Sequence, residues 1–286
     1  MAIQLDSITY TYGVGTPFEK QALSGISLTI ENGEFLGIIG HTGSGKSTFV
    51  QHLNGLLHPT TGAVTVNGVD ISAKTEEAKE MRHKVGMVFQ YPEHQLFEET
   101  IAQDIAFGPK NLGLSDDEVQ RRVREAMQLV GLDYDIYAER SPFHLSGGQM
   151  RRVAIAGVIA MEPDFLVLDE PSAGLDPFGR EEIFEQIIKL HKEKGLTVIL
   201  VSHNMEDISR MATRLIVLDK GQVVLDGPPL DIFKHERHVL QSVGVDVPPV
   251  SVLVESLRAR GIPISNDILT VDDAVAAIVQ GGQHVK

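Results

Sequence analysis

The sequence contains no cysteine and no tryptophan, and aromatic residues make up only 6% of its 286 residues. Without cysteine the chain can form no disulfide, so nothing points to an oxidising compartment. Long apolar runs are also missing, because the longest, Val153–Met161, is about half of the roughly 20 residues that a membrane-spanning helix needs. The first residues, MAIQLDSITYTYG, lack the apolar core of a signal peptide. We therefore expect a soluble cytoplasmic protein.

Positive charge is scarce, because 25 Lys and Arg stand against 39 Asp and Glu, giving a formal net charge of −14. Proteins that bind nucleic acid generally need Lys and Arg to neutralise phosphates, so this balance argues against such a partner. It suits a protein partner that presents positive charge. The length and the 42% hydrophobic content suffice for one large domain with a smaller appendage.

Strand and helix patterns alternate along most of the chain. The runs FLVLD (165–169) and TVILVS (197–202) are apolar at consecutive positions, which is typical of parallel strands buried on both faces. A helical insertion is expected at about 91–161. The predicted fold is therefore α/β, with a mixed or parallel sheet of the phosphate-loop NTPase kind and an antiparallel β region at the N-terminus. Strands are predicted at 3–11, 24–30, 34–39, 62–68, 84–89, 165–170, 197–202, 214–219 and 222–226.

Helix signals mark the insertion and the C-terminal end. Ser115 and Glu118 form a predicted capping box, and the helix that follows is expected to stop at Gly131. A helix is also predicted around 180–194. After about residue 230 the alternation of strand and helix patterns ends. Two helical patterns follow at 251–260 and 271–280, the second with a Thr270–Asp273 capping box. We divide the chain into a domain at 1–230 and a small helical appendage at 231–286.

The segment GHTGSGKS at 40–47 matches the pattern G-x-x-x-x-G-K-[ST] between a predicted strand and a predicted helix. Its glycines allow main-chain N–H groups to turn toward phosphates, and the helix N-terminus adds partial positive charge. Lys46 is expected to hold the β- and γ-phosphates, and the Ser47 hydroxyl to bind Mg²⁺. This context favours a phosphate site over a glycine turn that carries a surface lysine.

Two carboxylates and a histidine follow predicted strands. Asp169 and Glu170 end the run FLVLDE, and His203 follows TVILVS. The carboxyl ends of parallel strands face the crevice in which α/β sheets bind ligands. Asp169 is the expected acid on the Mg²⁺ side, and Glu170 is expected to polarise an attacking water. His203 is a candidate for contacting the γ-phosphate, although a lone histidine is more often a surface or capping residue.

Two weaker candidates and a second glycine motif complete the set. Gln90, just after the predicted strand 84–89, could contact Mg²⁺ or the attacking water. Tyr12 could stack on a base, although an edge-strand aromatic residue is the commoner explanation. LSGGQ at 145–149 places a serine and two glycines at a predicted helix start, which is locally a second anion site. One phosphate loop is already present, so this second anion site is more than one nucleotide-binding domain needs.

These motifs together resemble a known family. GHTGSGKST, Gln90, LSGGQ, FLVLDE, SAGLD (172–176) and His203 occur in the order and spacing of an ABC-type ATPase domain, over about residues 1–245. LSGGQ is the most specific of them, because other phosphate-loop proteins lack it. The segments YPEHQLFEET and LSGGQMRRVAIAGVIAMEPDFLVLDEPSAGLDPFGR are similar to the A-prime ATPase subunit of energy-coupling factor transporters. Those membrane complexes take up vitamins and transition-metal ions.

The resemblance implies a role for each motif residue, with ATP and Mg²⁺ as ligands. Tyr12 would stack on adenine, and the phosphates would be wrapped by Gly40, His41, Thr42, Gly43, Ser44, Gly45, Lys46, Ser47 and Thr48. Ser47 and Gln90 would ligate Mg²⁺ with Asp169 nearby, Glu170 would act as general base, and His203 would hold the γ-phosphate. The site of an opposite subunit would be completed by Leu145, Ser146, Gly147, Gly148, Gln149 and Asp176. The surplus anion site is thereby interpreted as half of a partner's site.

The resemblance also implies partners and a location. A second ATPase subunit, expected to be a paralogue, would pair head to tail with this chain, and the C-terminal region would help to join the two. A transmembrane coupling subunit would contact the groove near Gln90–Glu99, where Glu93, Glu98 and Glu99 are candidates for meeting its basic residues. The alternative is that they are solvated acids at a helix end, and for Glu99 this interpretation is favoured. A separate membrane protein would bind the solute. The expected location is the cytoplasmic face of the cell membrane.

Other functions remain open at this point. An ATPase subunit of another ABC importer is the nearest alternative. A nucleic-acid maintenance ATPase of the same superfamily is disfavoured by the negative charge. A scaffold that binds nucleotide without hydrolysing it is disfavoured because Glu170 and His203 are both present.

Overall fold

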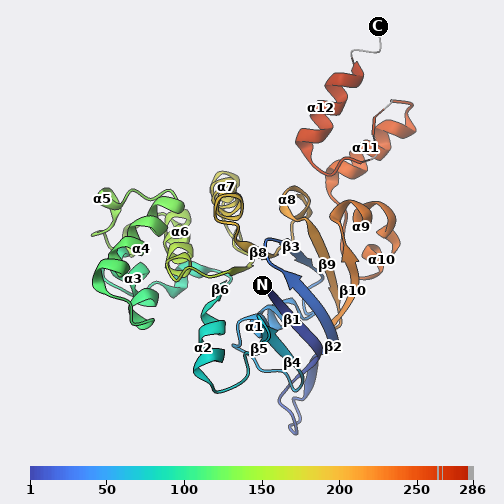
Figure 1. Ribbon diagram of the computed structural model, residues 1–286. Coiled ribbons are helices and arrows are strands. Elements are labelled where there is room, and N and C mark those ends of the chain that lie inside the picture. The colour runs from blue at the N-terminus through green and yellow to red at the C-terminus, as the bar shows by residue number, and fades with distance from the viewer. Residues whose placement is uncertain (263, 266, 283–286) are drawn as a thin grey trace.

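Two β-sheets organise the chain in the computed structural model, which describes residues 1–262, 264–265 and 267–282 (Figure 1). One sheet contains β1 (Ala2–Tyr12), β2 (Lys20–Glu31), β4 (Thr61–Val66) and β5 (Val69–Asp70). It is antiparallel, with the order β2-β1-β4-β5. Its strands confirm the predicted antiparallel β region, although β2 begins four residues earlier than the predicted strand 24–30.

The second sheet is mostly parallel and follows the order β10-β9-β3-β8-β7-β6. Strand β10 runs antiparallel to its neighbour. Every residue of the inner strands β3, β8 and β7 is buried, as the consecutive apolar runs predicted. The strand bounds are β3 (Phe35–Ile39), β6 (Val85–Val88), β7 (Phe165–Asp169), β8 (Thr197–Val201), β9 (Arg214–Asp219) and β10 (Gln222–Gly227).

Strand register brings the functional segments to one edge of this sheet. Asp169 at the end of β7 pairs with Val201 at the end of β8, and Ile38 of β3 pairs with the same Val201. The segments that follow these strands are the glycine loop, Glu170 and the Ser202–His203 pair. They therefore emerge side by side, as the α/β pattern predicted.

Helix α1 (Lys46–Leu53) lies between the two sheets. Its Phe49, Val50 and Leu53 are fully buried in one cluster with Ile3 of β1 and Ile199 of β8. The start of α1 is thereby fixed at the sheet edge directly behind the glycine loop. Helix α2 (Glu76–His83) follows β5 and is capped by the side chain of Thr75.

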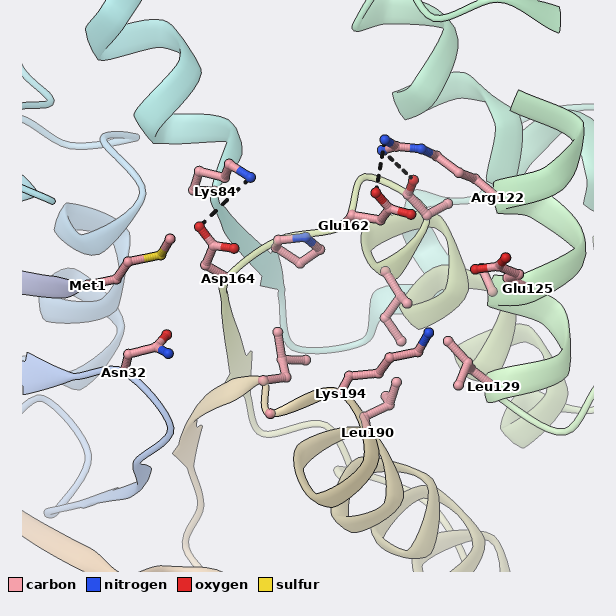
Figure 2. A pocket seen from close by; sticks show the side chains of 16 residues that line it. Met1, Asn32, Lys84, Arg122, Glu125, Leu129, Glu162, Asp164, Leu190 and Lys194 are labelled. Atoms are coloured by element: carbon pink, nitrogen blue, oxygen red, sulfur yellow. Dashed lines mark hydrogen bonds and ion pairs between the residues drawn. The ribbon is translucent and has the colours of Figure 1, made fainter. Parts of the chain in front are cut away.

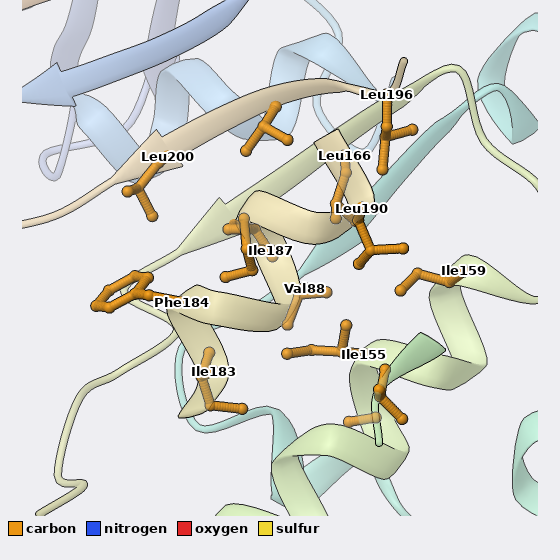
Figure 3. Close-up of a cluster of buried hydrophobic side chains, with 14 of the residues drawn as sticks. Val88, Ile155, Ile159, Leu166, Ile183, Phe184, Ile187, Leu190, Leu196 and Leu200 are labelled. Carbon is orange, nitrogen blue, oxygen red and sulfur yellow. The ribbon is translucent and has the colours of Figure 1, made fainter. Parts of the chain in front are cut away.

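The other face of the parallel sheet is covered by α7 (Pro177–Lys194) and α8 (Met205–Met211). Figure 3 shows side chains of α7 between Leu200 of the sheet and Ile159 of the helical insertion, among them Phe184, Ile187 and Leu190. Helix α7 begins three residues before the predicted start at 180. The cause is Asp176, whose carboxylate accepts a hydrogen bond from Gly179 N at 2.8 Å and caps the helix.

The predicted helical insertion is confirmed between β6 and β7. It carries its own buried face, in which Val119, Val123, Ala126 and Val130 share one core with the neighbouring helices, as predicted. Ser115 caps α4, but the Glu118 carboxylate binds Arg121 and Arg122 instead of completing the box. The elements are η1 (Pro92–Gln95), α3 (Ile101–Asn111), α4 (Asp116–Leu129), α5 (Tyr134–Tyr137), η2 (Pro142–His144) and α6 (Gly147–Ile159).

The helices that follow β10 belong to two different cores. Helices α9 (Pro229–His235) and α10 (Arg237–Ser242) bury Ile232, Phe233 and Leu240 in the main core. Helices α11 (Pro249–Ala259) and α12 (Val271–Gly282) form a separate small cluster, which contains Val250, Val254, Ile264, Ile268 and Ala274. The apolar packing thus changes near Pro248, and the division at residue 230 stays a prediction.

The two predicted C-terminal helices correspond to α11 and α12, and Thr270 donates to the Asp273 carboxylate at 2.6 Å while capping Asp273 N at 3.2 Å. Residues 263, 266 and 283–286 of the predicted appendage lie outside the described residues. In the part of the chain that the structure describes, no helix has the length and apolar character needed to cross a membrane.

Candidate nucleotide site

A cavity of about 570 Å³ lies at the carboxyl edge of the parallel sheet. It brings together most of the predicted site residues from separate stretches of the chain. The predicted residues that line it are Tyr12, Thr42, Gly43, Gly45, Lys46, Ser47, Thr48, Gln90, Asp169, Glu170 and His203. Lys20, Gln21, Ala22 and Lys220 line it as well, and no sequence pattern singled them out.

The glycines of the loop have different tasks. Gly40 has φ 153°, and a Cβ atom there would lie 2.3 Å from Leu218 O, so only glycine fits between the loop and β9. Gly43 has φ 84°, but a Cβ atom there would meet nothing within 4 Å. Its open side borders the cavity, which leaves room for a ligand to approach the main chain.

Lys46 brings a positive charge into the floor of the cavity. The side chain is only 6% exposed, and its Nζ donates to Gly40 O at 2.7 Å and to His41 O at 3.1 Å. Burial lowers the pKa of Lys46, while the negative charges of Glu170 and Asp169 act in the opposite direction. The ammonium group is thus held beside the loop at the position where phosphates would be bound.

Two predicted loop residues shape the loop instead of lining the cavity. The His41 ring lies with Nε2 2.9 Å from Asp219 Oδ1 at the end of β9. The main-chain oxygen of the buried Ser44 accepts a hydrogen bond from Gly221 N at 2.8 Å, which ties the loop to the turn between β9 and β10. Together with Gly40, these residues keep the loop in its turned conformation.

Asp169, Ser47 and Gln90 provide an oxygen-rich set at one side of the cavity. Burial raises the pKa of Asp169, and the Ser47 hydroxyl and the Lys46 charge oppose that shift. A hydroxyl, a carboxylate and an amide oxygen suit Mg²⁺, which prefers oxygen ligands. Among the described residues no group of three or more His, Asp and Glu gathers as a metal site. In phosphate-binding sites Mg²⁺ generally takes its other ligands from phosphate oxygens and water.

Glu170 occupies a strained position directly after β7. Its φ is 52°, in the left-handed region, and its N–H donates to Val201 O at 3.0 Å. Burial, together with the charges of Asp169 and Asp207, raises the pKa of Glu170 to about 7. The main-chain N–H of His203 and the Lys46 charge act to lower that pKa but do not outweigh the burial. A carboxylate with such a pKa is a better proton acceptor than an ordinary glutamate.

His203 lies against Glu170, with its Nε2 3.1 Å from Glu170 Oε1. The side chain is 56% exposed, and it borders the cavity. Burial and the Lys46 charge lower the pKa of His203, so the ring is mostly neutral at pH 7. One nitrogen can then donate a hydrogen bond while the other accepts one.

Tyr12 stands at the mouth of the cavity. Its hydroxyl is 3.0 Å from Thr48 Oγ1, and its ring packs edge-to-face on Tyr10, with centroids 4.8 Å apart. Tyr10 in turn packs edge-to-face on the buried His52 of α1. The exposed ring is thus held in place from behind, and stacking of adenine on it stays a prediction.

The LSGGQ segment does not reach this cavity. Ser146 and Gln149 form a complete capping box at the start of α6, and Gln149 Nε2 also donates to the Tyr137 hydroxyl at 3.3 Å. Ser146 and Gly147 are exposed on the helical insertion, apart from the cavity-lining residues. Asp176 likewise lies outside, capping α7. Within one subunit the two phosphate-binding motifs are therefore separate.

One expectation about the groove segment is wrong. Glu93 does not face outward toward a partner, because its carboxylate accepts two hydrogen bonds from the buried Arg151 at 2.9 and 3.1 Å. Burial acts to raise the pKa of Glu93, but the hydrogen bonds and charge of Arg151 outweigh it and hold that pKa below the ordinary value. Arg151 stands one helical turn before Ile155 on the buried face of α6, and this spacing could have revealed that Arg151 is buried, but not that Glu93 is its partner.

A second cavity, of about 460 Å³, lies between α4, α6 and α7 (Figure 2). Its basic side chains are largely committed: Lys84 Nζ is 3.8 Å from Asp164, and Arg122 Nη2 is 2.9 Å from Glu162. The glycine loop and the strand-end carboxylates belong to the first cavity. The first cavity is therefore the candidate nucleotide site.

Comparisons with known proteins agree with this geometry. A sequence model of the family described as "ABC transporter" matches residues 23–173, which is more than half of the chain. The chain is 55% identical over 280 residues to the energy-coupling factor transporter ATP-binding protein EcfA2 of Clostridium perfringens, covering 98% of each chain. It is 55% identical over 274 residues to the EcfA2 protein of Clostridium tetani, covering 96% of this chain and 95% of that one.

Solved structures show the same fold. The cbiO1 protein of Clostridium perfringens, described as part of the ABC transporter complex cbiONQ, has a TM-score of 0.74 and 36% identity; the match covers 88% of this chain and 98% of that one. The ATP-binding cassette MJ0796, described as a dimer in a post-hydrolysis state with ADP and Pi, has a TM-score of 0.69 and 31% identity, with 79% and 98% covered. The chain belongs to the ABC transporter ATPases and, within them, to the ATP-binding proteins of energy-coupling factor transporters.

Proposed function

We propose that this protein binds and hydrolyses ATP as a subunit of an energy-coupling factor transporter, and that the hydrolysis powers uptake of a vitamin or other micronutrient. The observation that carries the proposal is the joint presence of Lys46, Asp169 and Glu170 in one cavity behind a glycine loop. The names of the related proteins support the transport role. The combination of phosphate lysine, metal acid and general base is what ATP hydrolysis requires.

The chain's own residues divide the chemistry of hydrolysis between them. Lys46 and the loop N–H groups neutralise the β- and γ-phosphates, and His203 donates to a γ-phosphate oxygen. Ser47, Gln90 and Asp169 would hold Mg²⁺, which offsets charge on the β- and γ-oxygens when bound. Glu170 accepts a proton from water as the water oxygen attacks the γ-phosphorus. The bond to the ADP oxygen breaks, leaving ADP and inorganic phosphate.

A complete site requires a second ATPase subunit. The exposed LSGGQ loop, with Ser146 and the N–H groups of Gly147 and Gly148, would close on the γ-phosphate held by a partner's loop. The dimer described for MJ0796 supports a pair of such subunits. We infer that the partner is a paralogue in head-to-tail orientation, and that Asp176 lies at the same junction.

The membrane partner would bind beside the segment Gln90–Glu99. A groove of about 380 Å³ runs there, between η1, α3 and α6. Two exposed aromatic rings on its wall, Phe97 and Phe107, pack edge-to-face with centroids 4.9 Å apart. Such a groove suits a helix end from a transmembrane subunit, which would place this protein at the cytoplasmic face of the membrane. A separate membrane protein would bind the solute.

Glu170→Gln tests the assigned base. The change keeps the shape of the side chain and removes the proton acceptor, so hydrolysis should fall by at least about a hundredfold while ATP binding is retained. The measurement is phosphate release by the complex co-purified from native membranes, beside binding of a fluorescent ATP analogue. Equal hydrolysis by both proteins would contradict the assignment.

Retention of the wild type on DNA without any membrane partner would contradict the transport role.

A further inference from the structure

Arg151 is the largest side chain among the fully buried residues, and its guanidinium group has four hydrogen bonds. Its Nε and Nη2 donate to the two carboxylate oxygens of Glu93 at 3.1 and 2.9 Å. Its Nη1 donates to Pro171 O at 2.8 Å and to Ala173 O at 2.9 Å. We call this cluster of Arg151, Glu93, Pro171 and Ala173 the arginine clasp.

The clasp joins three segments that lie far apart in the sequence. Arg151 stands two residues after the LSGGQ loop, near the start of α6. Glu93 stands three residues after Gln90, in η1 at the groove. Pro171 and Ala173 closely follow Glu170, and Ala173 N donates back to Glu170 O at 3.1 Å. The Arg151 side chain therefore connects the groove, the LSGGQ loop and the turn that follows the general base.

The ring of Tyr91 brings two of these segments close together at a second point. Tyr91 has φ 57°, an unusual conformation for a tyrosine, and its ring lies 3.6 Å from where a Cβ atom of Gly174 would be. Gly174 has φ 77° in the same turn after Glu170. A side chain at position 174 would therefore contact the Tyr91 ring, so the groove segment lies close to the turn at this point too.

The chemistry of the clasp resists separation of its parts. A buried guanidinium needs its charge and donors satisfied, because losing one partner leaves an uncompensated charge. Two partners of Arg151 are main-chain carbonyls, so a displacement of η1 carries the Glu93 carboxylate, the Arg151 side chain and the turn with it. The planar fork fixes direction as well as distance.

We propose that Arg151 is a positioning residue, through which movement of the groove segment 91–99 shifts the LSGGQ loop and the turn after Glu170 together. The proposal rests on the proposed function, because the moving partner is the transmembrane subunit. The clasp acts on the hydrolytic step and not on ATP binding, since Arg151 and Glu93 lie outside the nucleotide cavity. Arg152, the next residue, makes a different contact from Arg151, because its Nη2 lies 3.9 Å from Glu182 of α7.

The decisive variant is the double change Glu93→Leu and Arg151→Met, which removes both buried charges at once and leaves apolar side chains of similar length. Arg152→Met with Glu182→Leu is the matched control on the same helix. In the complex co-purified from native membranes, the clasp variant should keep its KM for ATP within about twofold while kcat falls by about tenfold or more. The control should keep both constants within about twofold.

Arg151→Lys provides a milder test if the double variant folds poorly. It keeps a positive charge opposite Glu93 but loses the planar fork, so it should lower kcat less than the double change. A clasp variant that keeps the wild-type melting temperature, KM and kcat would overturn the proposal.

A further readout does not depend on transport. The chain has no cysteine, so Phe97→Cys and Phe178→Cys can carry a pair of spin labels at exposed positions on the groove segment and on α7. In the isolated protein the label-to-label distance distribution should be broader in the clasp variant than in the control. Unchanged width would contradict the clasp even if the wild-type complex proved inactive, whereas an inactive wild type alone would contradict only the proposed function.

Discussion

Single glycines in this protein carry very different constraints. Gly40 has φ 153°, and a Cβ atom there would lie 2.3 Å from a main-chain oxygen. A Cβ atom at Gly147, in the first turn of α6, would meet nothing within 4 Å. We predict that Gly40→Ala lowers the free energy of unfolding by at least about 2 kcal/mol. Gly147→Ala should change it by less than about 0.5 kcal/mol. Urea unfolding of the two variants compares them directly, and equal stability would contradict the clash at Gly40.

Residues whose role follows from local spacing could be predicted from the sequence. Lys46 and Ser47 are named by the glycine pattern, and Asp169 and Glu170 by their place at the end of an apolar run. The structure adds the burial of Lys46 and Asp169 and the strained φ of Glu170, which no pattern encodes. Glu93 was assigned to the surface because its partner, Arg151, is 58 positions away and only the fold brings them together.

Elements were predictable where one pattern decided them. The inner strands β3, β7 and β8 are apolar along nearly their whole length, and the structure buries them on both faces. The sequence pattern did not predict which hydrophobic core each C-terminal helix packs into. The residues after 230 read as a separate appendage, yet α9 and α10 bury Ile232, Phe233 and Leu240 in the main core, because amphipathic spacing shows a buried face but not what covers it.

Two truncated chains distinguish a domain boundary at residue 230 from one near Pro248. A chain ending at Val247 keeps α9 and α10 and loses mainly the small cluster of α11 and α12 with the surface pairs Lys234–Asp267 and Arg237–Glu255. Exposed pairs contribute less than about 1 kcal/mol each, so its melting temperature should stay within about 5 °C of the full chain.

A chain ending at Leu230 instead loses six buried apolar side chains of the main core, or roughly 10 kcal/mol of apolar burial, and should fail to unfold cooperatively. Thermal unfolding followed by circular dichroism tests both chains. Equal melting temperatures for the two truncations would favour a boundary at 230.

At the scale of the whole molecule, the two phosphate-binding motifs belong to different sites. Ser146→Arg should leave binding of an ATP analogue by the isolated chain unchanged within about twofold, because Ser146 lies outside the cavity. In the assembled complex it should reduce hydrolysis by at least about tenfold, because the loop would no longer fit a partner's γ-phosphate. Single-turnover hydrolysis in the complex measures this effect.

Ser115→Arg is the matched control for this variant. It removes the N-cap of α4 by the same substitution, at a similar stability cost of about 1 kcal/mol, on a helix away from the LSGGQ loop. Its hydrolysis should match the wild type. Loss of analogue binding by the isolated Ser146→Arg protein would show that the loop serves its own subunit's site.

The three fully buried strands of the parallel sheet also set how motion is distributed in the molecule. Main-chain amides in β3, β7 and β8 have buried neighbours on both faces, so they exchange with solvent only when the whole domain opens. Lys46, Glu170 and His203 are attached to the ends of these strands, whereas LSGGQ is carried by a different layer of helices. We therefore expect the reacting groups to stay in place at the ends of these strands, while the LSGGQ loop and, through the arginine clasp, the turn after Glu170 shift relative to them.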